Sequence, residues 1–457
     1  MELSYSKLTN KINILLVAIL VFSLKIQAQK VTVFNSSWSN PFMWSPPGPP
    51  LSSDSVTINH NVIVDTDIFF NSGSLTVSPG ASLSESPFIP KRINLISTQL
   101  NNKGTIVISY LTSTNDFIDN QDSIYVKKVF NTYGTSTTNS NSGKIYVGDS
   151  LSINGSGLTN YGIVTGNFIY NKGTIKNNKR ISTNYLQSDV SFINNDTVIV
   201  SKNWIEKGTF KNYLYADIAD TFHIYSGGSV ENYIVVTTGN FLWLDGTLDN
   251  SGTFTVPVIK VDTNGALNNN PKGIVVTTGN FIYNYGDMSL FNYSVIKTKN
   301  IISSGRIMGA FGCILISDSS NVSGIIDGSI DFCDATPPST SPPIDVFTGT
   351  VSSLVTFCTS NCSSVGIKDK LDKTISVAAY PNPVTDAVTL SWTVKEKGIY
   401  IIEMYDIIGQ KVYANSLEIN SIDYKFEVPC NNLTAGTYLL TVKNEIIFYK
   451  KLFLKIE

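Results

Sequence analysis

A triplet of an apolar residue, any residue and Asn recurs through the middle of the chain. Its Asn positions are Asn160, Asn177, Asn194, Asn212, Asn232, Asn250, Asn269 and Asn292, which lie 17 to 23 residues apart. A second triplet of Asn, an aromatic residue and Ile or Leu runs in phase with the first and begins at Asn167, Asn184, Asn203, Asn240 and Asn280. Two patterns that share one period indicate an internal repeat.

The repeat predicts a parallel β-helix, because its period is too short for propeller blades and matches one coil of a solenoid. Equivalent residues of successive coils would form columns along the axis. Asn suits such a column, since its amide can donate to the Asn of one neighbouring coil and accept from the other. Residues 100–102 and 117–119 look like degenerate upstream copies. We expect the solenoid over residues 51–335, and a cap over 29–50 that covers an otherwise unpaired strand edge.

The composition agrees with an all-β fold. The 457 residues are rich in Asn, Ser, Thr, Gly and β-branched or aromatic side chains, and long runs with helical periodicity are missing. The formal net charge is -2, with 15% charged residues. No basic surface for phosphate neutralisation is therefore expected, and nucleic acid is not an expected partner.

The N-terminus has the order of a secretory signal sequence. Lys7 and Lys11 precede an apolar run at residues 12–24, and Ala28 supplies a small residue for cleavage. The apolar run is shorter than the roughly 20 residues that a membrane span needs. We therefore expect residues 1–28 to be a signal peptide that is removed on export.

All five cysteines lie from Cys313 onward. An exported chain meets an oxidising compartment, so Cys313, Cys333, Cys358 and Cys362 are candidates for disulfides. Cys313 and Cys333 are one coil apart and would bridge neighbouring coils if their side chains align. A zinc site would lack ligands because the chain has only two His, so neither a metal nor a cofactor is expected. Cys430 is left over, and no partner for it can be deduced.

The period ends near residue 376, and strand-like runs of 5 to 10 residues then alternate with turns. This pattern is typical of a small immunoglobulin-like β-sandwich. Residues 336–375 are expected to form a linker and a terminal Cys-containing segment. Four motifs follow in order and contain Pro381, Asn382 and Pro383, then Gly409, then Gly436 and Tyr438, and finally Lys450 and Lys451. With these motifs, residues 376–457 resemble the C-terminal sorting domain of type IX secretion cargo.

The resemblance implies an export route. Such a domain directs passage across the outer membrane by the type IX secretion machinery and is then usually removed. The passenger is released or attached to surface lipopolysaccharide, so the expected location is secreted or at the outer cell surface. An adhesive or stalk domain of immunoglobulin-like fold is the alternative interpretation of the same strands.

Cleavage of polysaccharide is the enzymatic alternative for a β-helix, as a lyase or a glycoside hydrolase with two carboxylates about 5 to 10 Å apart. One cluster of candidates contains Asp327, Asp331 and Asp334, and another contains Asp217, Asp220 and His223. Asp also favours turns, and no motif places either cluster on one strand face. No catalytic residue is therefore assigned.

An aromatic column is the better candidate for ligand binding. Its members are Phe168, Tyr185, Trp204, Phe241 and Phe281 of the second triplet, with Tyr170, Trp243 and Tyr283 two residues later. The candidates for stacking on sugars are Trp204, Phe241, Trp243, Phe281 and Tyr283. If the column faces outward, it can stack on sugar rings; if it faces inward, it is core, which is the favoured alternative. We therefore predict a noncatalytic secreted or surface β-solenoid, adhesin-like or structural, for which extracellular glycans are candidate partners.

Overall fold

The computed structural model describes residues 28–359, 377–393, 398–406, 410–419, 423–443 and 448–456. The chain divides into two compact units, residues 1–365 and 366–457. Both are built from strands. Within the described residues the only helix is the 3-10 turn η1 (Pro41–Met43), and no helix is long and apolar enough to cross a membrane. The prediction of an all-β fold is confirmed, whereas the predicted signal peptide falls almost entirely outside the described residues.

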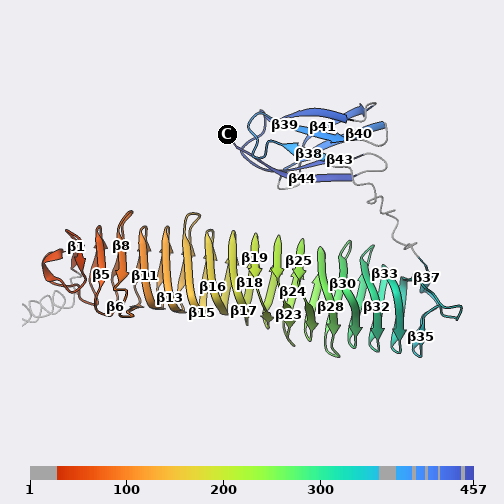
Figure 1. Cartoon of the computed structure of the whole chain (residues 1–457), viewed down its shortest axis with the longest axis horizontal. Helices are drawn as coiled ribbons and strands as arrows, with labels where there is room; N and C mark the ends of the chain where they lie inside the picture. Colours follow the sequence, from red (N-terminus) through yellow and green to blue (C-terminus); the bar gives the residue numbers. More distant parts are fainter. Residues whose placement is uncertain are drawn as a thin grey trace, which may run out of the picture. The chain divides into compact units, whose positions relative to one another are not determined.

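The first unit is a parallel β-solenoid of about 15 turns (Figure 1). Each regular coil has three strands, as in β21 (Thr209–Asn212), β22 (Tyr215–Ile218) and β23 (Thr221–Ile224). These pair in parallel and in direct register with β24 (Ser229–Asn232), β25 (Val235–Thr238) and β26 (Phe241–Leu244) of the next coil. We call the three positions the first, second and third strand of a coil. The predicted parallel β-helix is therefore present.

The other solenoid strands follow the same order along the chain. The short ones are β1 (Gln29–Thr32), β2 (Ser36–Ser37), β3 (Trp44–Ser45), β4 (Ser55–Ile58), β5 (Asn61–Val64), β6 (Ile68–Asn71), β7 (Ser74–Val77), β8 (Ser82–Glu85), β9 (Arg92–Ile96), β10 (Gln99–Asn102), β12 (Phe117–Asn120), β14 (Ser136–Asn139), β18 (Ser191–Asn194), β19 (Thr197–Val200), β20 (Trp204–Glu206), β27 (Thr247–Asn250), β29 (Ala266–Asn269), β31 (Asp287–Phe291), β35 (Val346–Phe347), β36 (Thr350–Val351) and β37 (Thr356–Cys358). The strands that continue through a corner are β11 (Thr105–Thr114), β13 (Ser123–Tyr133), β15 (Lys144–Asn160), β16 (Ile163–Asn177), β17 (Arg180–Ser188), β28 (Thr253–Val261), β30 (Ile274–Asn284), β32 (Val295–Ser303), β33 (Arg306–Val322) and β34 (Ile325–Asp334).

The core of the solenoid is made of inward-facing columns, because alternate residues of each strand point to opposite faces. In the first strands, Phe192, Phe210, Val230 and Leu248 lie one above another and are fully buried. Burying one such side chain contributes about 1.5–3 kcal/mol. Each regular coil buries several such side chains, which pack against those of the two neighbouring coils.

A continuous ladder of buried Asn side chains runs along the end of the first strands. Its members are Asn102, Asn120, Asn139, Asn160, Asn177, Asn194, Asn212, Asn232, Asn250 and Asn269. Each Nδ2 donates to the Oδ1 of the next member at 2.7–3.0 Å. Most members also donate to a backbone carbonyl of the next coil, as Asn194 does to Tyr215. The predicted pairing of Asn amides between coils is therefore present.

The register of the ladder differs from the sequence expectation at both ends. Leu290 stands opposite Asn269, so the predicted member Asn292 lies beyond the column, in a turn with φ 36°. Upstream, the copy at 117–119 is shifted by one residue and ends at Asn120. Asn139 was not predicted as a member of the ladder, because the first residue of its triplet is Thr137, where the repeat has an apolar residue.

The N-terminal end of the solenoid is closed by a short returning strand. β1 pairs in parallel with β4, and β3 pairs antiparallel with β1 on its other side. Lys30 Nζ donates to the carbonyls of Pro46, Pro47 and Gly48 at 3.0, 3.2 and 3.1 Å. An antiparallel strand on the outer edge leaves no parallel template for a further coil of another chain.

The last coil at the other end is fastened by a disulfide. Cys333 of β34 bonds to Cys358 of β37, its direct partner in the parallel register, with the Cα atoms 4.3 Å apart. Cys313 stands opposite Asp331, two residues away from Cys333, and its Sγ lies 3.9 Å from the Cys333 Sγ. Cys333 therefore bonds to Cys358 and not to Cys313, the pairing that aligned side chains would have allowed. Cys362 lies outside the described residues.

The second unit contains two small antiparallel sheets. One has three strands in the order β38 (Val377–Tyr380), β39 (Ala387–Thr393) and β42 (Asp423–Pro429). The other has four in the order β41 (Lys411–Ile419), β40 (Gly398–Tyr405), β43 (Gly436–Lys443) and β44 (Phe448–Lys455). Residues of both sheets, including Val388, Leu390, Ile402, Met404 and Leu440, form one buried cluster. This is the expected small β-sandwich.

Candidate functional site

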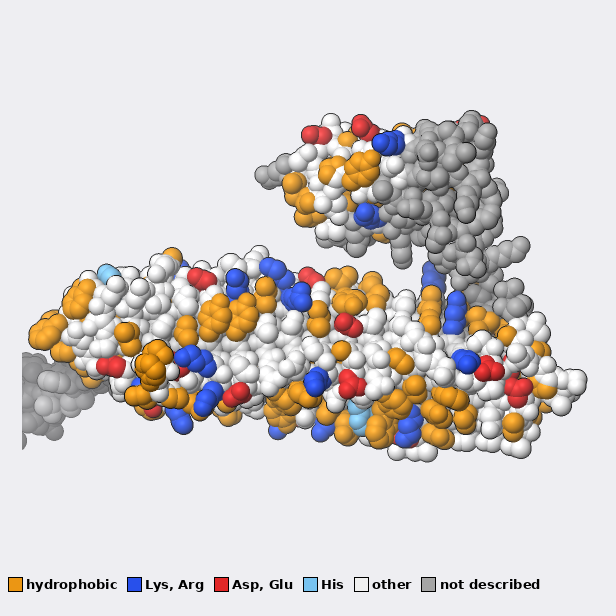
Figure 2. Space-filling view, viewed as in Figure 1, with side chains coloured by type: hydrophobic (Ala, Val, Ile, Leu, Met, Phe, Trp, Pro, Cys, Tyr) orange, Lys and Arg blue, Asp and Glu red, His pale blue; other side chains and the backbone are white. Residues whose placement is uncertain are grey.

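The aromatic face is the outward side of the third strands. Its rings are Phe168, Tyr170, Tyr185, Phe241, Trp243, Phe281 and Tyr283, all half-buried. Figure 2 shows hydrophobic side chains gathered along the lower edge of the solenoid, the edge on which the third strands β6 and β23 are labelled in Figure 1. Four of the five rings proposed for sugar stacking therefore lie on the outside.

Trp204 is the exception, because it is fully buried. Its partners in register are Leu186 and Phe222, which belong to the inward column, whereas Tyr185 precedes Leu186 and faces out. The second triplet is thus out of register by one residue at Trp204. The indole ring packs against Phe210 with ring centroids 4.3 Å apart and against Phe222 at 5.1 Å. Trp204 is core and cannot stack on a sugar in this fold.

Trp243 faces out, but both faces of its ring are covered. His223 of the preceding coil stacks on one side, with ring centroids 4.5 Å apart and an interplanar angle of 6°. Lys260 of the following coil places Nζ 4.5 Å from the ring centroid. The indole Nε1 donates to Asp262. Side chains that stack along the solenoid axis present their edges to solvent, so Trp243 has no free face for a ligand.

A hydrogen bond and an ion pair complete this stack. His223 Nε2 lies 2.8 Å from Asp245 Oδ2, and Lys260 Nζ lies 2.8 Å from Asp262 Oδ1. Burial alone would raise the pKa of Asp262, but hydrogen bonds from Lys260 and Trp243 outweigh it and hold the pKa below its usual value. The polar groups of the stack are therefore partnered within it, which favours a stabilising role over a catalytic one.

The other three rings proposed for sugar stacking also face outward. Phe281 and Tyr283, two residues apart on β30, stack on each other with centroids 5.4 Å apart. Phe241 precedes them along the same outward column, separated by Val258. Of the five proposed rings, Phe241, Phe281 and Tyr283 therefore remain as candidates for contact with a ligand.

A buried carboxyl group lies beneath the aromatic face. Glu206 is fully buried at the inward end of β20 and accepts hydrogen bonds from Trp204 Nε1 at 3.2 Å and from Gly208 N at 3.0 Å. Burial raises its pKa to about 8, against the lowering effect of those hydrogen bonds. Sequence reasoning missed Glu206, although its place in the strand alternation marks it as inward-facing.

The structure does not bring the proposed acidic clusters together as catalytic pairs. Asp327 is paired with Arg306 at 3.0 Å, whereas Asp331 is buried and accepts from Thr356. Asp334 accepts from Ser320. In the other cluster, Asp217 accepts from Thr237, Asp220 from Asn240, and His223 pairs with Asp245. Within the described part of the chain, no three His, Cys, Asp or Glu side chains are grouped to hold a metal ion.

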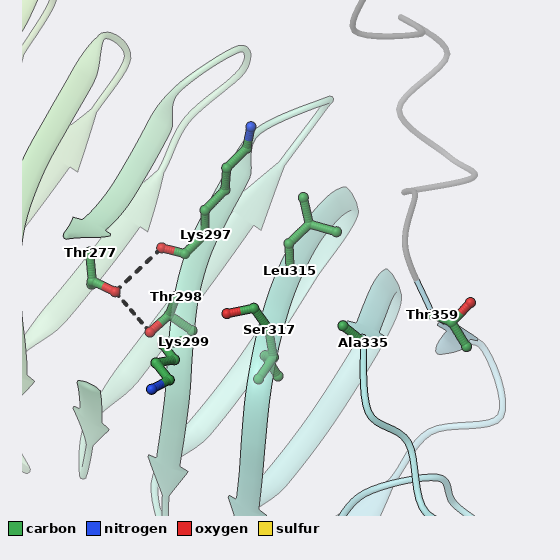
Figure 3. Close-up of a pocket in the computed structure, with 9 residues that line it drawn as sticks. Thr277, Lys297, Thr298, Lys299, Leu315, Ser317, Ala335 and Thr359 are labelled. Carbon is green, nitrogen blue, oxygen red and sulfur yellow. Dashed lines mark hydrogen bonds between the residues drawn. The ribbon is translucent and has the colours of Figure 1, made fainter. Parts of the chain in front are cut away.

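A hollow of about 440 Å³ lies near the C-terminal end of the solenoid (Figure 3). It is lined by Thr277, Lys297, Thr298, Lys299, Leu315, Ile316, Ser317, Ala335 and Thr359. Thr277 Oγ1 donates to Thr298 Oγ1 at 2.9 Å, and Lys299 pairs with Asp318 at 3.5 Å. Figure 3 shows Lys297 and Lys299 pointing in opposite directions along β32. The two ammonium groups therefore do not converge on one anion.

In the second unit, the first and last sequence motifs lie against each other. Asn382 Oδ1 accepts from the backbone N of Leu454 at 2.9 Å, and Lys451 Nζ donates to the carbonyl of Ala379 at 3.2 Å. Val384 forms a parallel bridge with Lys455: its backbone N donates to the carbonyl of Leu454, and its carbonyl accepts from the backbone N of Ile456. Pro381 and Pro383 flank Asn382 in the exposed segment after β38. The motif around Asn382 thus clamps β44.

The third motif closes a corner of the sandwich. Tyr438 is buried, its hydroxyl donates to the carbonyl of Thr434 at 2.8 Å, and its ring stacks on Phe453 with centroids 5.8 Å apart. Gly436 begins β43.

The other residues singled out in this unit are less fully defined. Gly409 lies outside the described residues, and Lys450 is placed only by its position in β44. Cys430 is a buried free thiol whose pKa is raised by burial.

Comparison with known proteins identifies the second unit. Residues 378–455 match the family described as the secretion system C-terminal sorting domain. This domain indicates type IX export, with secretion or attachment to the outer cell surface. A search of curated proteins found no match.

The chain matches one solved structure weakly. It is the crystal structure of chitinase ChiW from Paenibacillus sp. str. FPU-7, a bacterial cell-surface-expressed multi-modular enzyme. The identity is 9% over 67% of this chain and 24% of that chain, with a TM-score of 0.15. The chain spans about a quarter of that enzyme, and a similarity of this size carries no argument about the activity of this protein.

Proposed function

We propose that the solenoid is a noncatalytic, adhesin-like or structural element that the sorting domain delivers to or beyond the cell surface. The observation that supports this most is the Asn ladder, which joins ten successive positions of the column by side-chain hydrogen bonds. Together with the parallel strand pairing, it ties each coil to its neighbours along the axis. Such a body suits the display of an outer surface over a long distance.

The outer surface on which this proposal rests is the aromatic face. Phe281 and Tyr283 are half-buried, face outward and lie in a patch of other apolar side chains. Apolar patches on exported proteins are typical of contact sites, and aromatic rings suit the apolar faces of sugars. Extracellular glycans are therefore the proposed partners. Contact falls to Phe241, Phe281 and Tyr283, because Trp204 is core and the ring of Trp243 is already covered on both sides.

Binding of the full chain to a glycan array tests this role. We expect the double substitution Phe281→Ala and Tyr283→Ala to abolish binding, because it removes the exposed apolar area of the face. Tyr213→Ala is the matched control: Tyr213 is an exposed ring at another corner, stacked on Tyr233 at 4.8 Å. Equal binding by all three proteins would contradict contact through the aromatic face.

The enzymatic alternative has a separate readout. A β-helix lyase or glycoside hydrolase would release unsaturated products or reducing ends from a polysaccharide panel. Release that is abolished by Asp331→Asn, and retained in the Tyr213→Ala control, would contradict the noncatalytic proposal.

A further inference from the structure

A six-residue loop interrupts the solenoid between β8 and β9. We call residues 86–91 the Phe88 loop; its sequence is Ser-Pro-Phe-Ile-Pro-Lys. The next coils have no such loop at this corner, because β11 and β13 continue through it as single strands. The loop is therefore a local insertion into an otherwise continuous edge.

The tip of the loop exposes two large apolar side chains. Phe88 is 90% exposed and Ile89 is 58% exposed, and Phe88 is the most exposed large apolar residue among the described residues. Pro87 and Pro90 flank them and restrict the backbone, so the tip is held out without a large loss of chain entropy on binding. An apolar tip that its own chain leaves largely exposed marks a contact site.

The base of the loop is fixed by a buried carboxylate. Glu85 accepts from the backbone N of Lys91 and of Ser109, each at 2.8 Å, and from Ser109 Oγ at 2.7 Å. Its Oε1 also lies 2.7 Å from Lys127 Nζ. These bonds join the loop to the two following coils and give it a defined orientation.

Two cationic side chains that form no ion pair among the described residues stand beside the loop, while Asp67 Oδ1 accepts from the backbone N of Arg92 at 3.0 Å. Arg92 Cζ lies 5.0 Å and Lys128 Nζ lies 5.5 Å from the centroid of the same Tyr110 ring. Neither side chain forms an ion pair within the described part of the chain, so two like charges share one aromatic ring. Figure 2 shows a protruding group of hydrophobic side chains at the N-terminal part of the solenoid, bordered by Lys and Arg. This arrangement is complementary to an anion.

We propose that the Phe88 loop docks on an anionic lipid surface. The apolar tip would enter the boundary between headgroups and acyl chains, while Arg92 and Lys128 contact the phosphates. This combination of an apolar tip and neighbouring cations fits an amphiphile better than a soluble anion, which would leave Phe88 and Ile89 in water. The proposal is independent of glycan contact by the aromatic face.

Flotation of the purified full chain with lipid vesicles tests the proposal. We expect binding to vesicles of phosphatidylcholine mixed with phosphatidylglycerol, and roughly tenfold weaker binding to phosphatidylcholine alone.

Two double variants test the two parts of the site. The pair Phe88→Ser and Ile89→Ser should weaken binding by roughly tenfold or more, and so should the pair Arg92→Gln and Lys128→Gln. High salt should weaken it further, because surface charges are screened.

Matched controls separate the loop from general exposure and charge. Phe42 in the cap is 76% exposed, and Lys103 and Lys176 are exposed lysines at other positions. Phe42→Ser, and the pair Lys103→Gln and Lys176→Gln, should leave binding unchanged. Failure of the wild type to bind mixed vesicles would overturn the proposal, as would equal losses in loop and control variants. Self-association of the chain in sedimentation, abolished by Phe88→Ser and Ile89→Ser, would assign the loop to a second copy instead.

Discussion

Two neighbouring residues of the same type have different roles in this solenoid because one points inward and the other outward. The Asn194 side chain is buried in the ladder and bonded to Asn177 and Asn212, whereas the Asn195 side chain is exposed and donates to Asn178 at 2.8 Å. The same rule separates Trp204, which is core, from Tyr185, which faces out. At the scale of single residues, direction relative to the sheet decides function more than residue type.

The buried Glu206 predicts a pH dependence of stability. Its pKa is about 8 in the folded chain and about 4.5 in the unfolded chain, so folding favours the protonated form. Its stabilising contribution is fully present below about pH 4.5 and is lost as pH rises to 8, at about 1.4 kcal/mol per pH unit. Glu206→Gln should therefore match the wild type near pH 4.5 and have the higher thermal midpoint at pH 8.

Comparison of the two proteins by calorimetry at both pH values checks this expectation. The other titrating groups are common to both proteins, so the change in the difference between them isolates Glu206. A constant difference in thermal midpoint across the range would contradict a raised pKa at this position.

At the scale of the element, a coil has no stability of its own and depends on its neighbours. The coil formed by β18, β19 and β20 is held by backbone pairing to the coils on either side and by the Asn ladder. Asn194 also donates to the carbonyls of Asp196 and Tyr215, each at 2.9 Å. Loss of one amide therefore affects three successive coils.

Asn194→Ala should destabilise these coils locally by about 2–5 kcal/mol, because buried donors and acceptors lose their partners. Hydrogen exchange should show the loss of protection in residues 174–224, with the distant coils unchanged. Asn195→Ala is the matched control and should change protection by less than about 0.5 kcal/mol. A loss spread evenly over the whole solenoid would contradict nearest-neighbour stability.

At the scale of the whole molecule, the two compact units have separate roles. The solenoid unit contains the outer surfaces proposed for contact, and the second unit contains the sorting domain that indicates type IX export. Within the sorting unit, residues 72 positions apart meet where Asn382 accepts from Leu454. The sequence motifs at the two ends of this unit are therefore parts of one structural feature.

Deletion of residues 376–457 should leave the solenoid in the periplasm, because the signal for outer-membrane passage is removed. Immunoblots of cell fractions measure the location, and delivery of the truncated chain to the surface would contradict the sorting role.

Asn382→Ala should lower the stability of the sorting unit by about 0.5–1.5 kcal/mol in denaturant unfolding, since the exposed bond that clamps β44 is lost. Asn431→Ala, at an exposed position of the same unit, is the control and should be neutral. Equal losses in the two variants would contradict a specific role of the Asn382 bond.

The sequence by itself determined the solenoid, the Asn column and the sorting domain. The repeat can be recognised in the sequence because successive coils bury similar side chains at equivalent positions. The sorting domain can be recognised because its motifs lie in a fixed order. The sequence also predicted the β-sandwich, because runs of strand length alternate with turns. The expectation failed where a coil departs from the average, at Asn139, Asn292 and Trp204.

Only the tertiary structure decided which side of each strand is buried. A shift of one residue reverses the direction of every side chain, and turns of different length change the register between coils without changing the composition. Thus Trp204 became core, Trp243 was covered by His223 and Lys260, and Cys333 met Cys358. The Phe88 loop became visible as a site in the same way, because exposure and the meeting of Arg92 with Lys128 are properties of the fold.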